Sequence, residues 1–370
     1  MPAFYHHDLF SALRDLGADV QVIYARALIA QRVALGWQPP PMDTLPQRTL
    51  TPHAPIRDAL REVWRLRHER TRWHFVHAMW GERSFMVALL FMRALGLPTI
   101  QYCEAPNPHL RRSPLKRTAK ALYAHLIGRL PGAYMFTVAE PALALYPTFG
   151  YPVDHLYPLA YHRRARPLPN GEKSSGVEIV FAGQLIERKG VDILIQAIRP
   201  LFAEFPALRL TLIGSGGDRE ALERLAADSP AITFTGALPY DQIEGRIAAA
   251  RLFVLPSRWD GWGLVVNEAL SVGVPVLCSD QCGAAAVIRR GVNGDIFPAE
   301  NVMALRERLR EFLSHPQQWT AMSAAARATS ETLSAEQSAA YMMRVFQHLK
   351  EQHPTKPTPP WIEAGEGVRG

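Results

Sequence analysis

Long apolar runs and an export signal are both missing from this sequence. No uninterrupted apolar stretch approaches the roughly 20 residues that span a bilayer, and the longest candidate, 85–97, is interrupted by Arg93. The first residues, MPAFYHHDLF, have no basic segment followed by an apolar run, so they do not resemble a secretion signal. These absences argue against a membrane-spanning class and predict a cytoplasmic protein.

Cysteine is also scarce. The chain has three, of which Cys278 and Cys282 stand four apart and Cys103 stands alone. Neither a disulfide framework nor the spacing of a zinc site follows from this pattern. We therefore expect no bound metal.

What the chain does have is enough apolar sequence for two ordinary globular domains: 370 residues, 48 % hydrophobic and 20 % charged. The net charge of +7 is uneven, because residues 1–170 hold 21 Lys and Arg against 11 Asp and Glu, whereas the remainder holds 20 against 23. A basic first half suits an anionic acceptor, anionic lipid or simply a solvated Arg-rich surface. No helix-turn-helix, RNP or finger pattern occurs, so nucleic acid is not an expected partner.

Short apolar runs alternate with amphipathic stretches in the first half, which predicts an α/β lobe. Helical spacing starts at Leu9, and a second helix is expected at 85–95. Strands are expected at 19–25, 74–80 and 98–106. The chain begins at what resembles the loop after a first strand, so the first lobe is expected to lack that strand or to keep only a remnant at 1–5.

The second half shows the same alternation more clearly. A polar segment, 163–176, predicts a linker. The strands expected after it are 177–183, 208–214, 232–236, 252–257 and 274–280, alternating with helices in a doubly wound lobe. Two terminal helices are expected at 301–315 and 334–350. We therefore predict a first lobe at 1–170, a second at 171–350 and a disordered tail at 351–370.

The strongest motif is PSRWDGWGLVVNEAL, residues 256–270, which follows a buried strand. Ligands of open parallel sheets bind at this carboxyl end of the strands. Glycines on either side of Trp262 permit close approach to a ligand, and the helix expected from Gly263 favours a phosphate. Asp260 and Glu268 could accept hydrogen bonds from sugar or ribose hydroxyls, or be a helix cap and a solvated side chain.

Two other loops follow strands of the same lobe. In FAGQLIERKG, residues 181–190, Gly183 ends a strand, and Arg188 and Lys189 supply cations suited to phosphate, although a surface loop with incidental charge has the same pattern. The turn that begins at Gly214 is rich in glycine but is not a Walker loop. Because all three loops leave parallel strands, we expect them at one edge of the sheet.

Together these motifs resemble retaining glycosyltransferase family 4, whose GT-B fold has two facing Rossmann-like lobes. The resemblance covers residues 177–297 tightly and the first lobe loosely. It implies transfer of a sugar from a nucleotide diphosphate sugar, with retention and without a metal or another cofactor. Lys189 would bind the diphosphate, Glu268 the ribose and Asp260 the donor sugar. The backbone along the sugar and phosphates would be that of Gly261, Trp262, Gly263 and Leu264.

Two departures from the family pattern affect the donor site. The family's arginine position holds Gln184, and we hypothesise that Arg188 supplies the missing charge. The family's first acid is Asp260, which is one methylene shorter than Glu. In the mechanism that the resemblance implies, the leaving diphosphate is stabilised by these cations and accepts the proton of the incoming hydroxyl.

Candidate residues in the first half are less specific. The resemblance places Glu104, in YCEAP, near the reacting sugar as a third catalytic candidate, the alternative being a loop carboxylate. His6 and His7 are weaker candidates in the first loop, and His77 is expected in the core of a strand. A basic run, Arg111, Arg112, Lys116, Arg117 and Lys120, suits an anionic membrane surface.

The sequence thus predicts a glycosyltransferase of polysaccharide or glycoconjugate synthesis, with a glycan or lipid-linked acceptor and peripheral contact with the inner membrane face. A non-catalytic nucleotide-sugar-binding protein and a related GT-B epimerase are the alternatives. The nucleotide, the sugar and the linkage stay open at this point.

Overall fold

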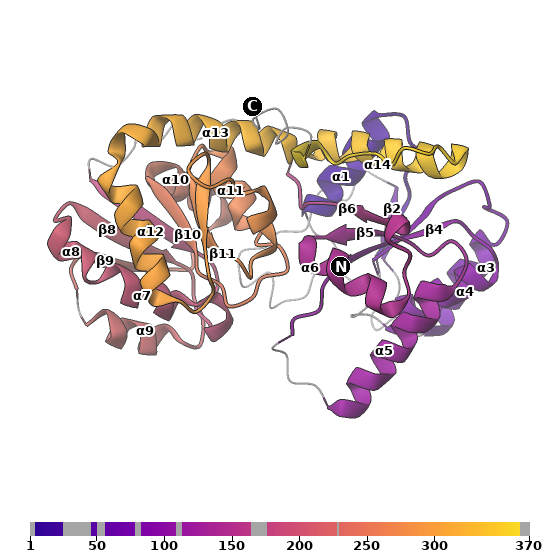
Figure 1. Cartoon of the computed structure of the whole chain (residues 1–370). Helices are drawn as coiled ribbons and strands as arrows, with labels where there is room; N and C mark the ends of the chain where they lie inside the picture. Colours follow the sequence, from indigo (N-terminus) through magenta and orange to yellow (C-terminus); the bar gives the residue numbers. More distant parts are fainter. Residues whose placement is uncertain are drawn as a thin grey trace. The chain divides into compact units, whose positions relative to one another are not determined.

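The structure, a computed structural model, describes residues 4–24, 46–49, 56–77, 83–108, 113–163, 176–227 and 229–362. The chain divides into two compact units. Unit 1 contains the described residues up to 163 together with 335–362, and unit 2 contains 176–334. Each unit has its own parallel sheet (Figure 1).

Unit 1 is a Rossmann-like layer structure. A four-stranded parallel sheet has the order β3-β4-β5-β6, and β1 and β2 form a separate parallel pair. Its elements are α1 (Phe4–Asp15), β1 (Val22–Tyr24), β2 (Gln47–Thr49), α3 (Ile56–Leu66), β3 (His74–Val76), α4 (Arg83–Ala94), β4 (Thr99–Glu104), α5 (Pro114–Arg129), β5 (Tyr134–Val138), α6 (Glu140–Leu145), β6 (Leu156–Pro158) and α14 (Ala335–Glu351). Within the described residues, α1 precedes every strand.

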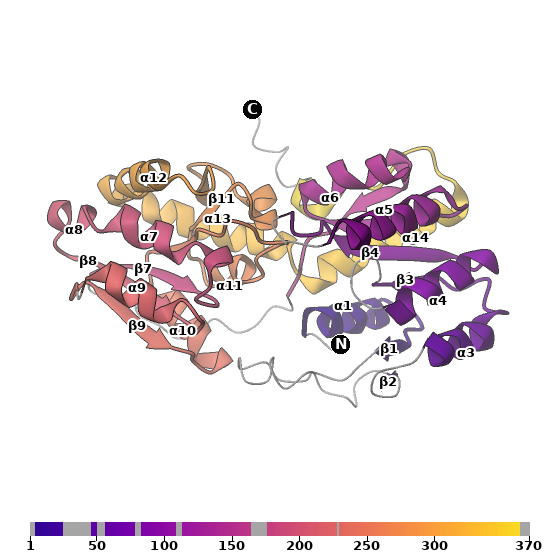
Figure 2. The same cartoon turned by 90° about the horizontal axis from the view of Figure 1, so that it is seen from below.

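The two faces of the unit 1 sheet bury alternate side chains of its strands, as a strand period of two requires. On β4, Cys103 joins the core formed with α4 and α5, whereas Tyr102 packs edge-on against His6 of α1. On β5, Phe136 meets Tyr341 and Phe346 of α14. Helices α1 and α14 therefore cover one face and α3, α4 and α5 the other (Figures 1 and 2).

Helix α14 belongs to unit 1, whereas residues 334–350 were expected in the second lobe. Helix α14 packs along α1, and Phe346 stacks on Trp73 with ring centroids 5.7 Å apart. Helical periodicity predicts that such a helix exists, but it does not reveal which sheet the apolar face covers. The packing of these aromatic rings determines that the helix covers the sheet of unit 1.

The expected disorder of the tail 351–370 is wrong for its first twelve residues. Lys356 Nζ donates to the carbonyls of Val153, at 3.2 Å, and Leu156, at 2.5 Å, and lies over the ring of Tyr157. Trp361 packs edge-on against Tyr341. These contacts, together with two buried prolines, anchor the segment on unit 1. Residues 363–370 lie outside the described part of the chain.

Unit 2 has a six-stranded, fully parallel sheet in the order β12-β11-β10-β7-β8-β9. Helices α7, α9 and α12 pack on one face, and α10, α11 and α13 pack on the other. The elements are β7 (Val177–Ala182), α7 (Val191–Ile198), α8 (Leu201–Glu204), β8 (Leu208–Ile213), α9 (Arg219–Ala226), β9 (Ile232–Gly236), α10 (Tyr240–Ala249), β10 (Leu252–Leu255), α11 (Val265–Ser271), β11 (Val276–Ser279), β12 (Gly294–Phe297), α12 (Val302–Ser314) and α13 (Trp319–Thr332).

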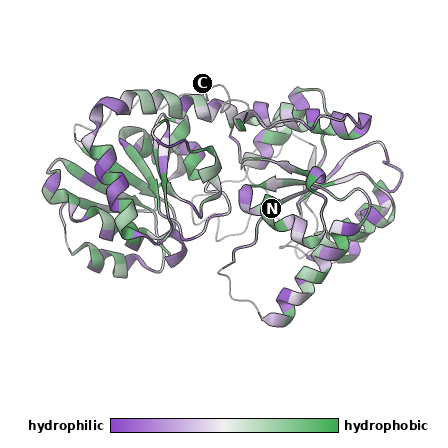
Figure 3. Cartoon of the chain, viewed as in Figure 1, coloured by the Kyte–Doolittle hydropathy of each residue, from purple (hydrophilic) through white to green (hydrophobic). Residues whose placement is uncertain are grey.

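This strand order is that of a dinucleotide-binding Rossmann sheet, in which the first strand lies in the middle. Here the first strand is β7, and the chain runs outward through β8 and β9 before returning to β10 on the other side of β7. Strands β10 and β11 are wholly buried, in keeping with the apolar colouring of the sheet in Figure 3. The direction of winding reverses between β7 and β10, so this is the position at which such sheets bind ligands.

The five strands expected in unit 2 are all present, as is the α/β class. The sixth strand, β12, and helix α13 were not foreseen. In unit 1 the expected helices at Leu9 and at 85–95 correspond to α1 and α4. Most of the expected linker, 164–175, lies outside the described residues, as do Arg111 and Arg112 of the basic run.

Candidate functional site

Two loops meet where the winding of the unit 2 sheet reverses. The loop after β7 carries Gly183, Arg188 and Lys189, and the loop after β10 carries Ser257 and Asp260. The loops are joined through the backbone, because the Arg258 N–H donates to the Arg188 carbonyl at 2.9 Å. The structure thus brings together the residues that the two motifs nominated separately.

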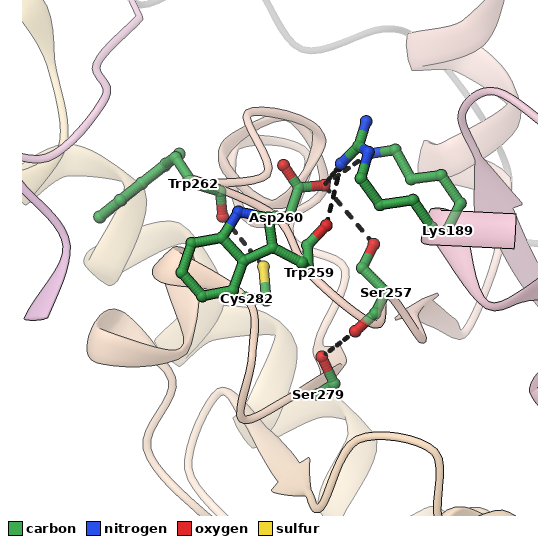
Figure 4. A network of polar contacts seen from close by, with 8 residues as sticks. Lys189, Ser257, Trp259, Asp260, Trp262, Ser279 and Cys282 are labelled. Atoms are coloured by element: carbon green, nitrogen blue, oxygen red, sulfur yellow. Dashed lines mark hydrogen bonds and ion pairs between the residues drawn. The ribbon is translucent and has the colours of Figure 1, made fainter. Parts of the chain in front are cut away.

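An ion pair across this junction is the centre of the site. Lys189 Nζ lies 2.5 Å from Asp260 Oδ2, and the two side chains are only 12 % and 13 % exposed. Figure 4 shows the ammonium and the carboxylate pointing toward one another. The Ser257 hydroxyl lies 3.5 Å from the same carboxylate oxygen. A pair so shielded from water interacts more strongly than an exposed pair.

Arg188 approaches the same carboxylate. Its Nη1 lies 3.8 Å from Asp260 Oδ2 and donates to the Trp259 carbonyl at 2.9 Å. Two cations therefore share one anion. This position agrees with the hypothesis that Arg188 supplies the positive charge that the family has at the position of Gln184.

Glycine at position 190 makes the close contact of the two loops possible. Gly190 has φ +65°, and a Cβ there would lie 2.1 Å from the Pro256 carbonyl oxygen. Any other residue would push the loop after β7, and Lys189 with it, away from the loop after β10. In the pair Lys189–Gly190, the lysine thus supplies the charge and the glycine permits the close packing of the two loops.

The loop that begins at Gly214 has a similar requirement. A Cβ on Gly214, which has φ +135°, would lie 1.8 Å from the Gly183 carbonyl oxygen. The loop after β8 therefore lies directly on the loop after β7, and Leu185 N–H donates to the Ser215 carbonyl at 2.9 Å. This contact explains the glycine at position 214 without a ligand, and phosphate binding by Gly214 stays a prediction.

The backbone around Asp260 is held by the segment after β11. Asp260 N–H donates to the Gln281 carbonyl, and Gly283 N–H donates to the Asp260 carbonyl, both at 3.0 Å. Burial, with a contribution from Cys278, raises the pKa of the Cys282 thiol well above its usual value, so the thiol donates to the Trp262 carbonyl. The Asp260 carboxylate is accordingly presented from a fixed loop.

Trp262 is buried at 2 % exposure, and its indole N–H donates to Asn267 Oδ1 at 2.7 Å. Gly261, Gly263 and Leu264 complete the loop, and α11 begins at Val265, two residues later than expected. Glu268 is buried in α11. The roles assigned to these residues by the resemblance stay predictions.

The candidates of unit 1 are Glu104, at the carboxyl end of β4, and two histidines of α1. Glu104 ends β4; its carbonyl accepts from the Tyr146 hydroxyl at 2.9 Å, and its carboxylate accepts from the Tyr161 hydroxyl. His6 and His7 are both buried in α1. Burial, reinforced by His77 and His162, holds the pKa of His6 well below its usual value, so its imidazole is neutral.

His77 does not occupy the core of a strand, as the sequence had suggested. It follows β3, is exposed, and packs edge-on against Tyr102 and His6 with ring centroids 5.5 Å apart. His6 and His77 are therefore neighbours at the ring of Tyr102, and Glu104 is linked to the same ring through Tyr161, whose ring centroid lies 6.3 Å from that of Tyr102. A catalytic role for these residues stays a prediction.

Residues 165–329 match the family described as Glycosyl transferases group 1. This part of the chain is a group 1 glycosyl transferase domain.

The curated relatives of the chain match over similar lengths. A GDP-mannose-dependent monoacylated alpha-(1-6)-phosphatidylinositol monomannoside mannosyltransferase of Corynebacterium glutamicum is 36 % identical over 161 residues, 41 % of this chain and 42 % of that protein. The sulfoquinovosyl transferase SQD2 of Arabidopsis thaliana is 32 % identical over 149 residues, 40 % of this chain and 28 % of that protein. The chain thus matches less than half the length of these relatives.

Solved structures extend the likeness beyond the group 1 domain. Anabaena HepE in complex with UDP superimposes with a TM-score of 0.71 at 15 % identity, over 94 % of this chain and 97 % of that one. WaaG, a glycosyltransferase involved in lipopolysaccharide biosynthesis, gives 0.64 at 17 % identity, over 91 % and 93 %. At such low identity these likenesses show the fold alone, which is GT-B with two Rossmann-like units.

Sequence reasoning missed one residue of the group 1 domain that the structure makes prominent. Arg258, inside the strongest motif, hydrogen-bonds Asp192 and Glu300, which are 66 and 42 residues away in the chain. No local spacing links these positions. The only available signal was a cation within the nominated motif, two residues before Asp260.

Proposed function

We propose that this protein is a retaining glycosyltransferase that moves a sugar from a nucleotide diphosphate sugar to a glycan or lipid-linked acceptor, in the synthesis of a polysaccharide or glycoconjugate. The observation that carries the proposal is the pairing of Lys189 with Asp260 where the winding of the unit 2 sheet reverses. A cation and an acid held there suit a substrate that joins a diphosphate to a hydroxyl-rich ring.

The ion pair suggests how the donor enters. The diphosphate takes the place of Asp260 beside Lys189 and Arg188, since it carries more charge and presents more acceptor oxygens than one carboxylate. Asp260 is then released to accept hydrogen bonds from the donor sugar. Glu268 would hold the ribose hydroxyls, and the nearby N–H groups at the start of α11 would add to the positive field.

The reaction itself needs little from the side chains of unit 2. Lys189 and Arg188 stabilise the negative charge that develops on the leaving diphosphate, which is a transition-state effect and therefore raises the rate. The leaving oxygen takes the proton of the acceptor hydroxyl on the same face of the sugar. Neither a covalent intermediate nor a metal ion has a part in this mechanism. Glu104 would orient the acceptor or the sugar.

A panel of donors tests the proposal. The names of the relatives nominate GDP-mannose, and HepE was solved with UDP, so GDP-, UDP- and ADP-sugars are each incubated with the chain and with pooled glycan or lipid acceptors. We expect one nucleotide series to give nucleoside diphosphate and a new glycoside with the donor's anomeric configuration by NMR. Binding of a donor without transfer or hydrolysis would favour a non-catalytic binding protein, and epimerised donor would favour an epimerase.

We further propose that unit 1 contacts an anionic membrane through α5. Three leucines of this helix, Leu115, Leu122 and Leu126, are 80 %, 70 % and 49 % exposed, and their spacing places them on one face. The helix has Lys116, Arg117 and Lys120 and no acidic residue. Among the described residues, no helix is long and apolar enough to cross a bilayer. An apolar stripe with flanking cations suits the headgroup region.

Vesicle co-sedimentation checks this contact. Replacing Leu115 and Leu122 together by Ser should lower binding to phosphatidylglycerol-containing vesicles about 10-fold or more, because each buried leucine contributes about 1.5–3 kcal/mol. The matched control is Met303→Ser, which changes a 57 % exposed apolar side chain of unit 2 and should leave binding unchanged. No binding of the unmodified chain at low salt would remove the proposal.

A further inference from the structure

Arg258 is the most extensively hydrogen-bonded side chain of the loop after β10. Its Nη1 and Nη2 donate to the two carboxylate oxygens of Asp192 at 2.8 and 2.7 Å, and Nη1 also donates to the Glu187 carbonyl at 2.6 Å. Its Nε donates to Glu300 Oε1 at 3.0 Å. One guanidinium therefore joins segments that follow β7, β10 and β12.

These bonds hold the backbone segments before and after Lys189. The carbonyls of the two residues before it are both held by residue 258, Glu187 by the side chain and Arg188 by the backbone N–H. Asp192, three residues after Lys189, accepts the bidentate pair. Within the described part of the chain, Lys189 and Arg258 share no side-chain hydrogen bond; the link runs through the backbone on both sides of Lys189.

The turn that carries Lys189 is short. Residues 187–189 form a single 3₁₀ turn, and α7 begins after Gly190 without a side-chain cap. A lysine side chain is flexible, so the position of its ammonium is well defined only if the backbone that carries it is fixed. Holding that backbone from both sides limits where the ammonium can reach.

We propose that Arg258 is a positioning residue that acts on the donor through Lys189, by fixing the turn from which the ammonium reaches the diphosphate. This inference rests on the proposed function. The Arg258 guanidinium is occupied by Asp192, Glu187 and Glu300, so it contributes to binding by geometry instead of by a contact of its own.

A comparable ion pair elsewhere in unit 2 serves as the control. Arg310 makes a bidentate pair with Glu204 at 2.8 and 2.8 Å, between α12 and α8. Its partners are not residues of the loops after β7 and β10. Arg310→Gln thus removes the same chemistry without touching the Lys189 turn.

A double-mutant cycle on the full chain tests the inference, with the dissociation constants of UDP and GDP measured by titration calorimetry. Arg258→Gln should weaken binding of the preferred nucleotide about 10-fold, since a displaced charge-assisted contact is of that size. In the Lys189→Ala background the same change should have less than about a twofold effect, because residues that act through one another are not additive. Arg258→Lys, which keeps the charge but loses the bidentate fork, should lie between.

The outcomes separate the two proposals. If Lys189→Ala leaves both dissociation constants unchanged, the proposed donor site fails. If Lys189→Ala weakens binding but Arg258→Gln does so equally in both backgrounds, or has no more effect than Arg310→Gln, the positioning role fails alone. Should Arg258→Gln not fold, Arg258→Lys takes its place in the cycle, with the same expected loss of effect in the Lys189→Ala background.

Discussion

Replacing Lys189 by Ala is expected to weaken the binding of a nucleoside diphosphate about 100-fold. A charge-assisted hydrogen bond contributes about 1.5–3 kcal/mol, and each 1.4 kcal/mol is a factor of ten. The loss is enlarged because Asp260, 13 % exposed, would be left without its lysine partner and would repel the phosphates. Titration calorimetry with UDP and GDP measures the effect.

The controls for this experiment test charge and location separately. Lys189→Arg keeps a cation on the same turn and should recover part of the affinity. Arg310→Ala removes a cation on α12 and should leave the dissociation constant unchanged. Equal weakening by Lys189→Ala and Arg310→Ala would mean that the nucleotide responds to the overall charge of the unit and not to this site.

Asp260→Asn is expected to move binding and catalysis in opposite directions. The amide no longer neutralises Lys189, so a nucleoside diphosphate without its sugar should bind about fivefold to tenfold more tightly, a gain of roughly 1–1.4 kcal/mol. Transfer should fall about 100-fold, because the carboxylate that would accept hydrogen bonds from the donor sugar is gone. Calorimetry and a transfer assay with the preferred donor report the two effects.

A second aspartate provides the comparison. Asp295 pairs with Arg290 at 3.3 Å and Arg308 at 3.7 Å. Asp295→Asn changes a charge of the same sign in the same unit, and neither binding nor transfer should change. If Asp260→Asn weakens nucleotide binding, Asp260 does not compete with the diphosphate, and the proposed exchange of partners is wrong.

Much of unit 2 could be predicted from sequence because four of its five predicted strands, β7, β8, β9 and β10, are short runs that end at or just before a glycine or proline. Strand β12 escaped because it begins with Gly294 and Asp295, so its four residues have no alternating or continuous apolar pattern. It lies at the edge of the sheet, where one neighbouring strand, β11, is sufficient to hold it. Propensity says little about such a strand.

The candidate site was predictable in its members but not in its contacts. Lys189 and Asp260 were nominated by separate motifs, and the rule that parallel strands open on one edge brought the loops together. That their side chains pair directly depends on Gly190 passing within van der Waals contact of Pro256, which only coordinates reveal. Arg258 was missed for the same reason, since its partners are remote in sequence. That α14 packs on unit 1 likewise depends on aromatic contacts between residues remote in sequence.

The most direct test of the donor site is a crystal structure of the full chain with UDP or GDP, whichever binds. The proposed donor site predicts diphosphate oxygens within hydrogen-bond distance of Lys189 Nζ at the carboxyl ends of β7 and β10, with the Lys189–Asp260 ion pair opened. A nucleotide bound elsewhere, or at this edge with that ion pair intact, would contradict it.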